Sequence, residues 1–383
     1  MDIDLDEEQK MMLTTARKFL EKECPKSLVR ETYEDELGYS VNLWRQVVEL
    51  GWIAMPFPEI YGGLGRSFLD LALILEETGR SLAPIPLLST VALGGFPILE
   101  FGSDAQKEAI IPKLIQGELM LTSALAGIDG DYSPAAMAIS ASRKDTNTFI
   151  LSGTAPFVPY AQIAHIILCP TITTNDCAED NATVFLVNSE VNDIDIKLLK
   201  TMAGEKHCLV SFDNAVVNDS DVIGTVNNGQ KILPRMLLLA SVAKCAEMNG
   251  NMRRILEMCV DHASTRMQFG RHIGSFQAIQ HMLVDAAVDV DASVLLARQA
   301  AWRISERMPC EREAAMAKIW CSEAQRRVAM VGIRVHGGVG FMQDHDMTLY
   351  FQQGTIGEVM FGDAEFHRST LAGWLESQSH VFI

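Results

Sequence analysis

The spacing of apolar residues changes twice along this chain, and these changes constrain its fold more than any other feature. From Asp6 to about Gly127 apolar residues recur at helical intervals, in stretches such as ALILEETGRSL and AQKEAIIPKLI. Between about 128 and 222 the pattern becomes short runs rich in β-branched and aromatic residues, such as TFILSGTAPF and TVFLVN. Helical periodicity returns after Asn227-Asn228-Gly229. We therefore predict an α+β fold with an N-terminal all-α domain (1–127), a middle β-barrel or β-sandwich domain (128–222) and a C-terminal four-helix bundle (223–383).

The composition narrows the classes of partner. The chain has 383 residues, 48% of them hydrophobic, which is enough for a sizeable core. Lys+Arg 32 against Asp+Glu 49 gives a net charge of −17, so the average field repels nucleic acid and anionic lipid surfaces, and we expect neither as a partner. The first ten residues are acidic, and we find no apolar run of about 18 residues. We therefore expect no leader peptide, no membrane span and a cytoplasmic location.

The cysteines do not indicate a metal site. The chain has eight cysteines, and no two of them show the C-x-x-C spacing typical of zinc sites. We expect buried or surface thiols and no metal. They are Cys24, Cys169, Cys177, Cys208, Cys245, Cys259, Cys310 and Cys321.

An apolar stripe marks the C-terminal third. Its members recur at steps of four and three, so they would line one face of a helix. Such a stripe is typical of a packed core or a subunit interface rather than of a ligand site. The residues are Leu283, Ala287, Val290, Val294, Ala297, Ala301 and Ile304.

Three motifs suggest a family. The sequence TRMQFG (265–270), followed by IGSFQAIQ (273–280), could by itself be a basic turn between two helices. The glycine cluster VHGGVGF (335–341) is not a dinucleotide fingerprint, because no strand precedes it and the G-x-G-x-x-G spacing is absent. Together with PEIYGGLG near position 60, their order and spacing resemble the acyl-CoA dehydrogenase family, flavoenzymes that oxidise the Cα–Cβ bond of acyl-CoA thioesters. The resemblance covers essentially the whole chain.

The resemblance implies a dimer of dimers with FAD lying across a subunit interface. In that family, residues of the two C-terminal motifs reach the adenosine-diphosphate half of an FAD bound mainly by the neighbouring subunit. A guanidinium fork suits a pyrophosphate, and glycines let backbone amides approach it. The family usually has glutamine where this chain has Arg334, a change that keeps or strengthens anion binding. The corresponding residues here are Arg266, Phe269, Gln277, Arg334, Gly337 and Gly338.

The residues that would meet the flavin ring differ from the family pattern. The family carries a segment like LTEPxAGSD, which here reads LTSALAGID (121–129), so that Thr122 is kept and the ligand-binding serine is replaced by Ile128. The family's W-I-T, whose threonine hydroxyl reaches the flavin N5 edge, appears here as Phe157-Val158-Pro159. Proline offers neither a hydroxyl nor an N–H, although a strand proline can also mark an edge position.

The catalytic base is also missing. In the family a stretch like EIYEGTSEIQR carries the glutamate that removes the substrate's α-proton, and in EVMFGDAE (358–365) that position is Phe361. A few members carry the base one residue before an arginine that lies under the ligand; here these residues are Pro234 and Arg235. Phenylalanine and proline cannot accept a proton. The nearest acid is Asp363, a weak candidate for a substitute base, because residues two apart do not face the same way and a surface or capping aspartate is the simpler interpretation.

The resemblance leaves three functions open. What this chain would lend to a neighbour's FAD is kept, whereas what it would use for its own flavin ring and proton transfer is lost. We therefore expect the non-catalytic subunit of a heteromeric (α2β2) acyl-CoA dehydrogenase, like those acting on steroid side-chain or dicarboxylic acyl-CoAs, with a paralogous chain supplying the base. The alternatives are a self-sufficient homotetramer with a displaced base and a flavin-free structural homologue. Arg235 and the region 88–95 would line the acyl-CoA pocket, and an electron-transfer flavoprotein would accept the electrons.

Overall fold

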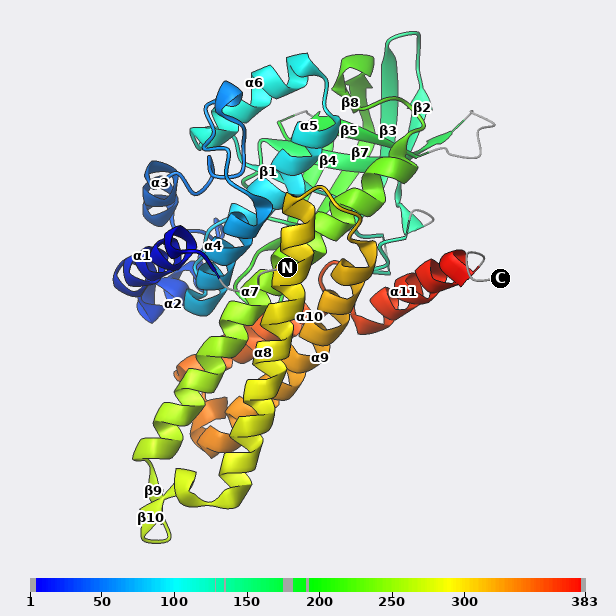
Figure 1. Ribbon diagram of the computed structural model, residues 1–383. Helices are drawn as coiled ribbons and strands as arrows, with labels where there is room; N and C mark the ends of the chain where they lie inside the picture. Colours follow the sequence, from blue (N-terminus) through cyan, green and yellow to red (C-terminus); the bar gives the residue numbers. More distant parts are fainter. Residues whose placement is uncertain (1–4, 128, 134–135, 175–181, 191–192, 380–383) are drawn as a thin grey trace. The chain divides into compact units, whose positions relative to one another are not determined.

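The structure, a computed structural model, describes residues 5–127, 129–133, 136–174, 182–190 and 193–379 (Figure 1). The chain forms two compact units that interleave along the sequence. The first consists of residues 1–30, 67–83 and 241–383, and the second of residues 31–66 and 84–240. The predicted order of helices, a β segment and helices again is confirmed, while the domain boundaries at 127/128 and 222/223 stay a prediction.

Three helices of the first third begin at capping boxes. Asp6 accepts a hydrogen bond from the backbone N–H of Gln9, and Ser67 and Ser103 cap their helices in the same way. In each case the third helical residue bonds back to the cap, which satisfies two of the N–H groups that a helix start leaves open. The elements are α1 (Glu7–Glu23), α2 (Lys26–Glu34), α3 (Val41–Glu49), α4 (Phe68–Ser81), a π-helical segment η2 (Leu88–Gly95), α5 (Phe96–Phe101) and α6 (Asp104–Ile115).

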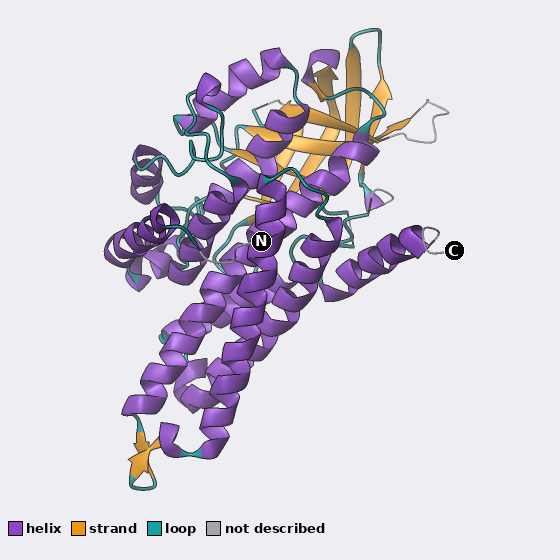
Figure 2. Cartoon of the chain, in the orientation of Figure 1, coloured by secondary structure: helices purple, strands orange, loops and turns teal. Residues whose placement is uncertain are grey.

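The second unit contains a mixed sheet (Figure 2). The strand order is β6-β7-β3-β2-β4-β5-β8, and β1 pairs in parallel with β4. The β2–β4 pair is also parallel, and the other neighbours are antiparallel. The strands are β1 (Leu121–Ser123), β2 (Ile139–Arg143), β3 (Thr148–Pro159), β4 (Ile166–Thr174), β5 (Ala182–Asn188), β6 (Ile194–Leu199), β7 (His207–Asn218) and β8 (Val222–Ile223).

One face of this sheet supplies a continuous core. In the longest pairing, Phe149 lies opposite Val217 and Leu151 opposite Ala215, and all four side chains are buried. Because side chains alternate along a strand, this register places the alternate apolar residues of β3 and β7 on the same face. Among the described strands β6 and β8 end the sheet without pairing to each other, so the path is open rather than a closed barrel.

The first unit contains a bundle whose helices are joined by buried polar side chains. Ser293 Oγ donates to Asn249 Oδ1 at 2.6 Å, Gln325 Nε2 donates to Asn251 Oδ1 at 3.0 Å, and Asn251 Nδ2 donates to the Tyr350 carbonyl at 3.2 Å. These bonds connect four helices around one interior, as predicted. The helices and the short hairpin between them are α7 (Gly229–Thr265), β9 (Met267–Gln268), β10 (Arg271–His272), α8 (Gln277–Ser305), α9 (Glu311–His336), α10 (Asp346–Val359) and α11 (Ala364–Ser379).

The predicted apolar stripe lies on α8. From Val290 to Ile304 its members are buried, whereas Leu283 and Ala287, near the β9–β10 hairpin, are half-buried. On another face of α8, Val284 and Val288 are each 60% exposed. The stripe is therefore core over most of its length. Within the described ranges, no helix combines the length and hydropathy that crossing a membrane requires.

Candidate functional site

Phe361 lies in a tight turn between α10 and α11. Helix α10 ends at Val359, and Phe361 follows its C-cap Met360 with φ 60°, a left-handed conformation that is uncommon for an aromatic residue. Its side chain is only 3% exposed. Gly362 continues the turn at φ 89°, which favours glycine. The position that the family resemblance gives to the base is therefore a buried, conformationally restrained phenyl ring.

Two polar side chains hold this turn. The ammonium group of Lys318, from α9, donates to the carbonyls of Gly357 (3.2 Å), Glu358 (2.9 Å) and Gly362 (2.8 Å). His367 Nε2 donates to the carbonyl of Phe361 at 2.8 Å. Burial lowers the pKa of Lys318 to about 8 and that of His367 to about 4. The histidine is therefore neutral at neutral pH, with its proton on Nε2.

Asp363 has a structural partner. Its Oδ1 accepts the backbone N–H of Phe366 at 2.9 Å, which caps the start of α11, and the side chain is exposed. This arrangement fits the capping interpretation. A role as a substitute base stays a prediction.

The residues predicted to reach a neighbour's FAD lie at one end of the helical bundle. Arg266 follows α7, Phe269 is at the tip of the β9–β10 hairpin, and Gln277 is the first residue of α8 (Figure 1). All three are exposed, and Phe269 is 92% exposed with φ 53°. A fully exposed phenylalanine on a hairpin is unusual for a surface that faces only water.

The glycine cluster lies at the same end of the bundle. His336, the last residue of α9, stacks on His262 of α7 with ring centroids 4.5 Å apart, which brings this cluster beside the start of the hairpin. Gly337 has φ 64°, and a Cβ added at Gly337 or Gly338 would meet no atom within 4 Å, so the backbone there is open to a ligand. Arg334 is exposed one turn earlier. Exposed guanidinium groups beside open backbone fit the diphosphate of FAD.

A third imidazole lies beside the stacked pair, tilted against His336. His345, the N-cap of α10, lies 5.1 Å from His336, centroid to centroid. Burial lowers the pKa values of His262 and His336, and the neighbouring imidazoles lower them further; Arg266 contributes at His262. We therefore expect both rings to be neutral at neutral pH. Among the residues that the structure describes, no group of three or more His, Cys, Asp or Glu is placed to hold a metal.

The residues predicted to face the flavin ring lie in the second unit. Thr122, on β1, is fully buried, and its hydroxyl donates to the Pro159 carbonyl at 2.6 Å. Val158 is 1% exposed, whereas Phe157 is 49% exposed at φ 56°. Pro159 has neither an N–H nor the hydroxyl that the family's threonine offers to flavin N5. Flavin contacts of Thr122, Phe157 and Val158 stay a prediction. Ile128 lies outside the described residues.

Arg235 is held by a carboxylate that the sequence did not reveal. Its Nε and Nη2 donate to the two oxygens of Glu100 at 2.8 and 2.7 Å, a bidentate pair between α7 and α5. The two residues are 135 positions apart, so no local spacing could have indicated the pair. Lys318 was also missed. Its only signal was a lysine among apolar neighbours in AAMAKIWCSEA.

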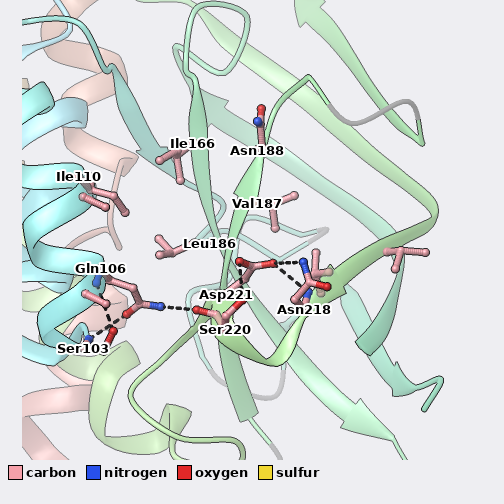
Figure 3. Close-up of a pocket in the computed structure, with 14 residues that line it drawn as sticks. Ser103, Gln106, Ile110, Ile166, Leu186, Val187, Asn188, Asn218, Ser220 and Asp221 are labelled. Carbon is pink, nitrogen blue, oxygen red and sulfur yellow. Dashed lines mark hydrogen bonds between the residues drawn. The ribbon is translucent and has the colours of Figure 1, made fainter. Parts of the chain in front are cut away.

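A separate cavity of about 560 Å³ lies between α6 and the sheet of the second unit (Figure 3). Gln106 closes one side of it and donates to the Ser220 carbonyl at 2.9 Å. None of the site residues predicted from the sequence lines this cavity. Its lining residues are Ser103, Ala105, Gln106, Ala109, Ile110, Ile166, Leu186, Val187, Asn188, Val216, Val217, Asn218, Ser220 and Asp221.

The succession of helices, mixed sheet and helical bundle is that of the acyl-CoA dehydrogenase fold. The family models for the acyl-CoA dehydrogenase N-terminal and C-terminal domains match residues 6–118 and 227–376. The chain belongs to the acyl-CoA dehydrogenase family, whose members are FAD-dependent flavoproteins.

Individual relatives are similar over nearly their whole length. Acyl-CoA dehydrogenase FadE27 of Mycobacterium tuberculosis is 30% identical over 349 residues, 89% of this chain and 90% of that protein. A chain in the crystal structure of the ChsE4-ChsE5 complex, also from Mycobacterium tuberculosis, is 28% identical with a TM-score of 0.90, covering 98% of this chain and 99% of that one. A variant of the Tcur3481-Tcur3483 steroid ACAD is 26% identical with a TM-score of 0.88, covering 98% and 99%.

Proposed function

We propose that this chain is the non-catalytic subunit of a heteromeric, α2β2 acyl-CoA dehydrogenase. A paralogous chain supplies the base and the intact flavin pocket, and this chain completes the clamp on the partner's FAD. The observation that carries the proposal is Phe361. A buried phenyl ring in a restrained turn cannot remove the α-proton of a thioester, and loss of a general base ordinarily costs about 10²–10⁴-fold in rate.

The contrast between the two sets of flavin residues supports this role. Arg266, Phe269 and Arg334 are exposed and could be offered to another subunit. On the ring side, the Thr122 hydroxyl is already bonded inside the chain. FAD, when bound, accepts the hydride that leaves the substrate's β-carbon; the part of this chain is to hold the diphosphate.

The names of the similar proteins agree with a two-chain enzyme. One similar structure is a complex of ChsE4 with ChsE5, and another is named for two chains, Tcur3481 and Tcur3483, as a steroid ACAD. By analogy we propose α,β-dehydrogenation of a fatty or steroid acyl-CoA, with an electron-transfer flavoprotein as the acceptor. Arg235, the residue assigned to the substrate, is held by Glu100 in this chain, which fits a subunit whose own acyl-CoA pocket is not used.

The first test is the flavin content of the assembled protein. The chain purified from its native host should elute with a paralogous chain and contain about half a flavin per polypeptide, because only the partner has the ring pocket. The chain expressed alone should show no acyl-CoA turnover. A full flavin per chain with bleaching by an acyl-CoA would support the self-sufficient homotetramer instead, and a partner complex without flavin absorbance would support the flavin-free homologue.

The second test concerns position 361. In the complex, Phe361→Glu should leave the acyl-CoA oxidation rate nearly unchanged, because the proposed reaction takes place at the partner's flavin. The isolated variant should remain inactive, since its own ring-side contacts are still missing. A rate increase of about 10²-fold or more in the isolated variant would show that only the base was absent, and would overturn the proposal.

A further inference from the structure

Lys318 is an unusual residue for the interior of a helical bundle. Its side chain is fully buried, and its four hydrogen-bond acceptors are the Ser322 hydroxyl and the carbonyls of Gly357, Glu358 and Gly362. Ser322 Oγ in turn donates to the Glu358 carbonyl at 3.0 Å. Burying an ammonium ion is costly unless every proton finds an acceptor, so an apolar residue of the same length would fill this space more cheaply. The arrangement therefore needs an explanation other than packing.

The three carbonyl acceptors share one location, the end of α10 and the turn that follows it. The last carbonyls of a helix have no partner within the helix, and a cation at that end is favoured by the helix dipole. Lys318 satisfies two such carbonyls, those of Gly357 and Glu358, and then reaches across the turn to Gly362. One side chain thus ties the helix end to the far side of Phe361.

We propose that Lys318 is the positioning residue of the turn 360–363, and that it fixes residue 361 in its left-handed conformation whichever side chain stands there. The inference depends on the proposed function only for what residue 361 does. It implies that only the side chain at position 361 differs from the family's base, and that the backbone of the turn keeps the conformation that would hold a base there.

His367 is the second tie. Its Nε2–H donates to the Phe361 carbonyl from the first turns of α11, at the point where the chain is left-handed. Strained backbone of this kind persists only where its surroundings determine it. Lys318 and His367 bond to carbonyls on successive residues, 361 and 362, and so fix both peptide planes of the turn.

Hydrogen–deuterium exchange of the full-length chain tests this role. The reporter amides are those of Met360, Phe366 and His367, which bond to Ile356, to the Asp363 carboxylate and to the Asp363 carbonyl. In Lys318→Met these amides should exchange about tenfold faster or more, because the carbonyls lose their donor and the turn opens locally. The milder Ser322→Ala should also speed the exchange of these amides, by a smaller factor. This variant keeps the test informative if Lys318→Met does not fold.

Leu71→Ala is the matched control. Leu71 is fully buried on α4, a helix of the same unit that packs against α1 and α8, so its removal weakens the fold away from the turn. It should speed exchange in α4 and leave the reporter amides protected relative to that helix. If Lys318→Met and Leu71→Ala gave the same exchange pattern, Lys318 would be an ordinary core residue and the inference would fail.

The pH dependence gives a readout that a purely structural role would not change. Burial lowers the pKa of Lys318 to about 8 in the closed turn, whereas a lysine exposed by local opening titrates at its higher, ordinary value, so opening takes up a proton above pH 8. In the unmodified chain the reporter amides should therefore gain protection, after correction for intrinsic exchange, as the pH rises through about 8. The break should disappear in Lys318→Met and persist in Cys321→Ser. The charged or titratable groups facing Lys318 are Lys244 and Cys245 from α7, Cys321 from α9, Glu358 from α10, Asp363 from the turn and His367 from α11.

This experiment separates the inference from the proposed function. Exchange at the turn needs neither flavin nor partner, so a failure here leaves the heteromer untouched. Conversely, a chain that proved to be a self-sufficient enzyme would still need residue 361 to be positioned by Lys318. A reporter segment that is unprotected in the unmodified chain would overturn the inference directly.

Discussion

In the assembled protein, Arg266→Ala in this chain should remove most of the flavin, even though the chain carries no catalytic base. Arg266 follows α7 and is exposed, one helical turn beyond His262. The ring of His262 stacks on His336, the residue just before the open backbone at Gly337. A guanidinium fork on a diphosphate forms charge-assisted bonds that alanine cannot replace. Truncating one partner of such a pair costs about 2–5 kcal/mol, or roughly 30-fold to several thousand-fold in affinity. Flavin titration of the apo-complex, followed by fluorescence, measures this loss.

Arg271→Ala is the control for the Arg266→Ala experiment. Arg271 belongs to the same hairpin and is also exposed, but its guanidinium lies over the Phe276 ring, 4.0 Å from the centroid. The substitution removes the same charge from the same surface, so a long-range electrostatic effect would appear equally in both variants. We expect Arg271→Ala to keep its flavin. Equal losses in the two variants, or no loss in Arg266→Ala, would contradict a direct contact with FAD.

The fold was predictable because the apolar periodicity is strong and local. The helices before residue 118 and after residue 227, and the strands between 139 and 223, follow from residue spacing alone. The parallel pairing of β2 with β4 and the interleaving of 67–83 with the C-terminal helices depend on contacts between distant residues. No local pattern specifies such contacts, which is why a barrel and a sandwich were both left open.

The candidate site was predictable only where a motif marks it. Arg266 and Gly337 lie in motifs with a recognisable order, and the structure places the ends of their helices side by side through the His262–His336 stack. Glu100 belongs to no such motif, because its role depends on Arg235, which only the fold brings next to it. Lys318 is similar, since three of its four acceptors are backbone carbonyls about 40 residues away, which have no sequence signature.

A buried carboxylate, Glu76, joins the helices that lead to Arg266 and Gln277. We expect Glu76→Gln to destabilise the fold strongly. Glu76, on α4, is 4% exposed and pairs with Arg253 of α7 at 2.8 Å and with Arg298 of α8 at 3.0 Å. Removing its charge leaves two partly buried guanidinium groups without their counter-ion. Breaking a buried pair costs about 3–5 kcal/mol, and the partial exposure of both arginines places this case at about 3 kcal/mol.

Glycines bring the helices close enough for this network. A Cβ at Gly250 of α7 would collide with the Glu76 carbonyl, and one at Gly79 of α4 would collide with the Glu247 carbonyl, so the two backbones touch where the carboxylate meets its arginines. Because the two helices pack this closely, water cannot enter to solvate the two arginines unless α4 and α7 move apart. Urea unfolding of the full-length chain, followed by circular dichroism, measures the loss of stability.

Glu7→Gln is the matched change at an exposed pair. Glu7 bonds to Lys10 at 2.8 Å, with side chains 89% and 54% exposed, and such pairs contribute about 0–1 kcal/mol. Its unfolding midpoint should stay close to that of the unmodified chain, while that of Glu76→Gln falls. Helices α7 and α8 flank Arg266 and the β9–β10 hairpin. Glu76→Gln should therefore also bind flavin more weakly in the complex than Glu7→Gln does. Similar midpoints for the two variants would mean that the network around Glu76 does not hold these helices together.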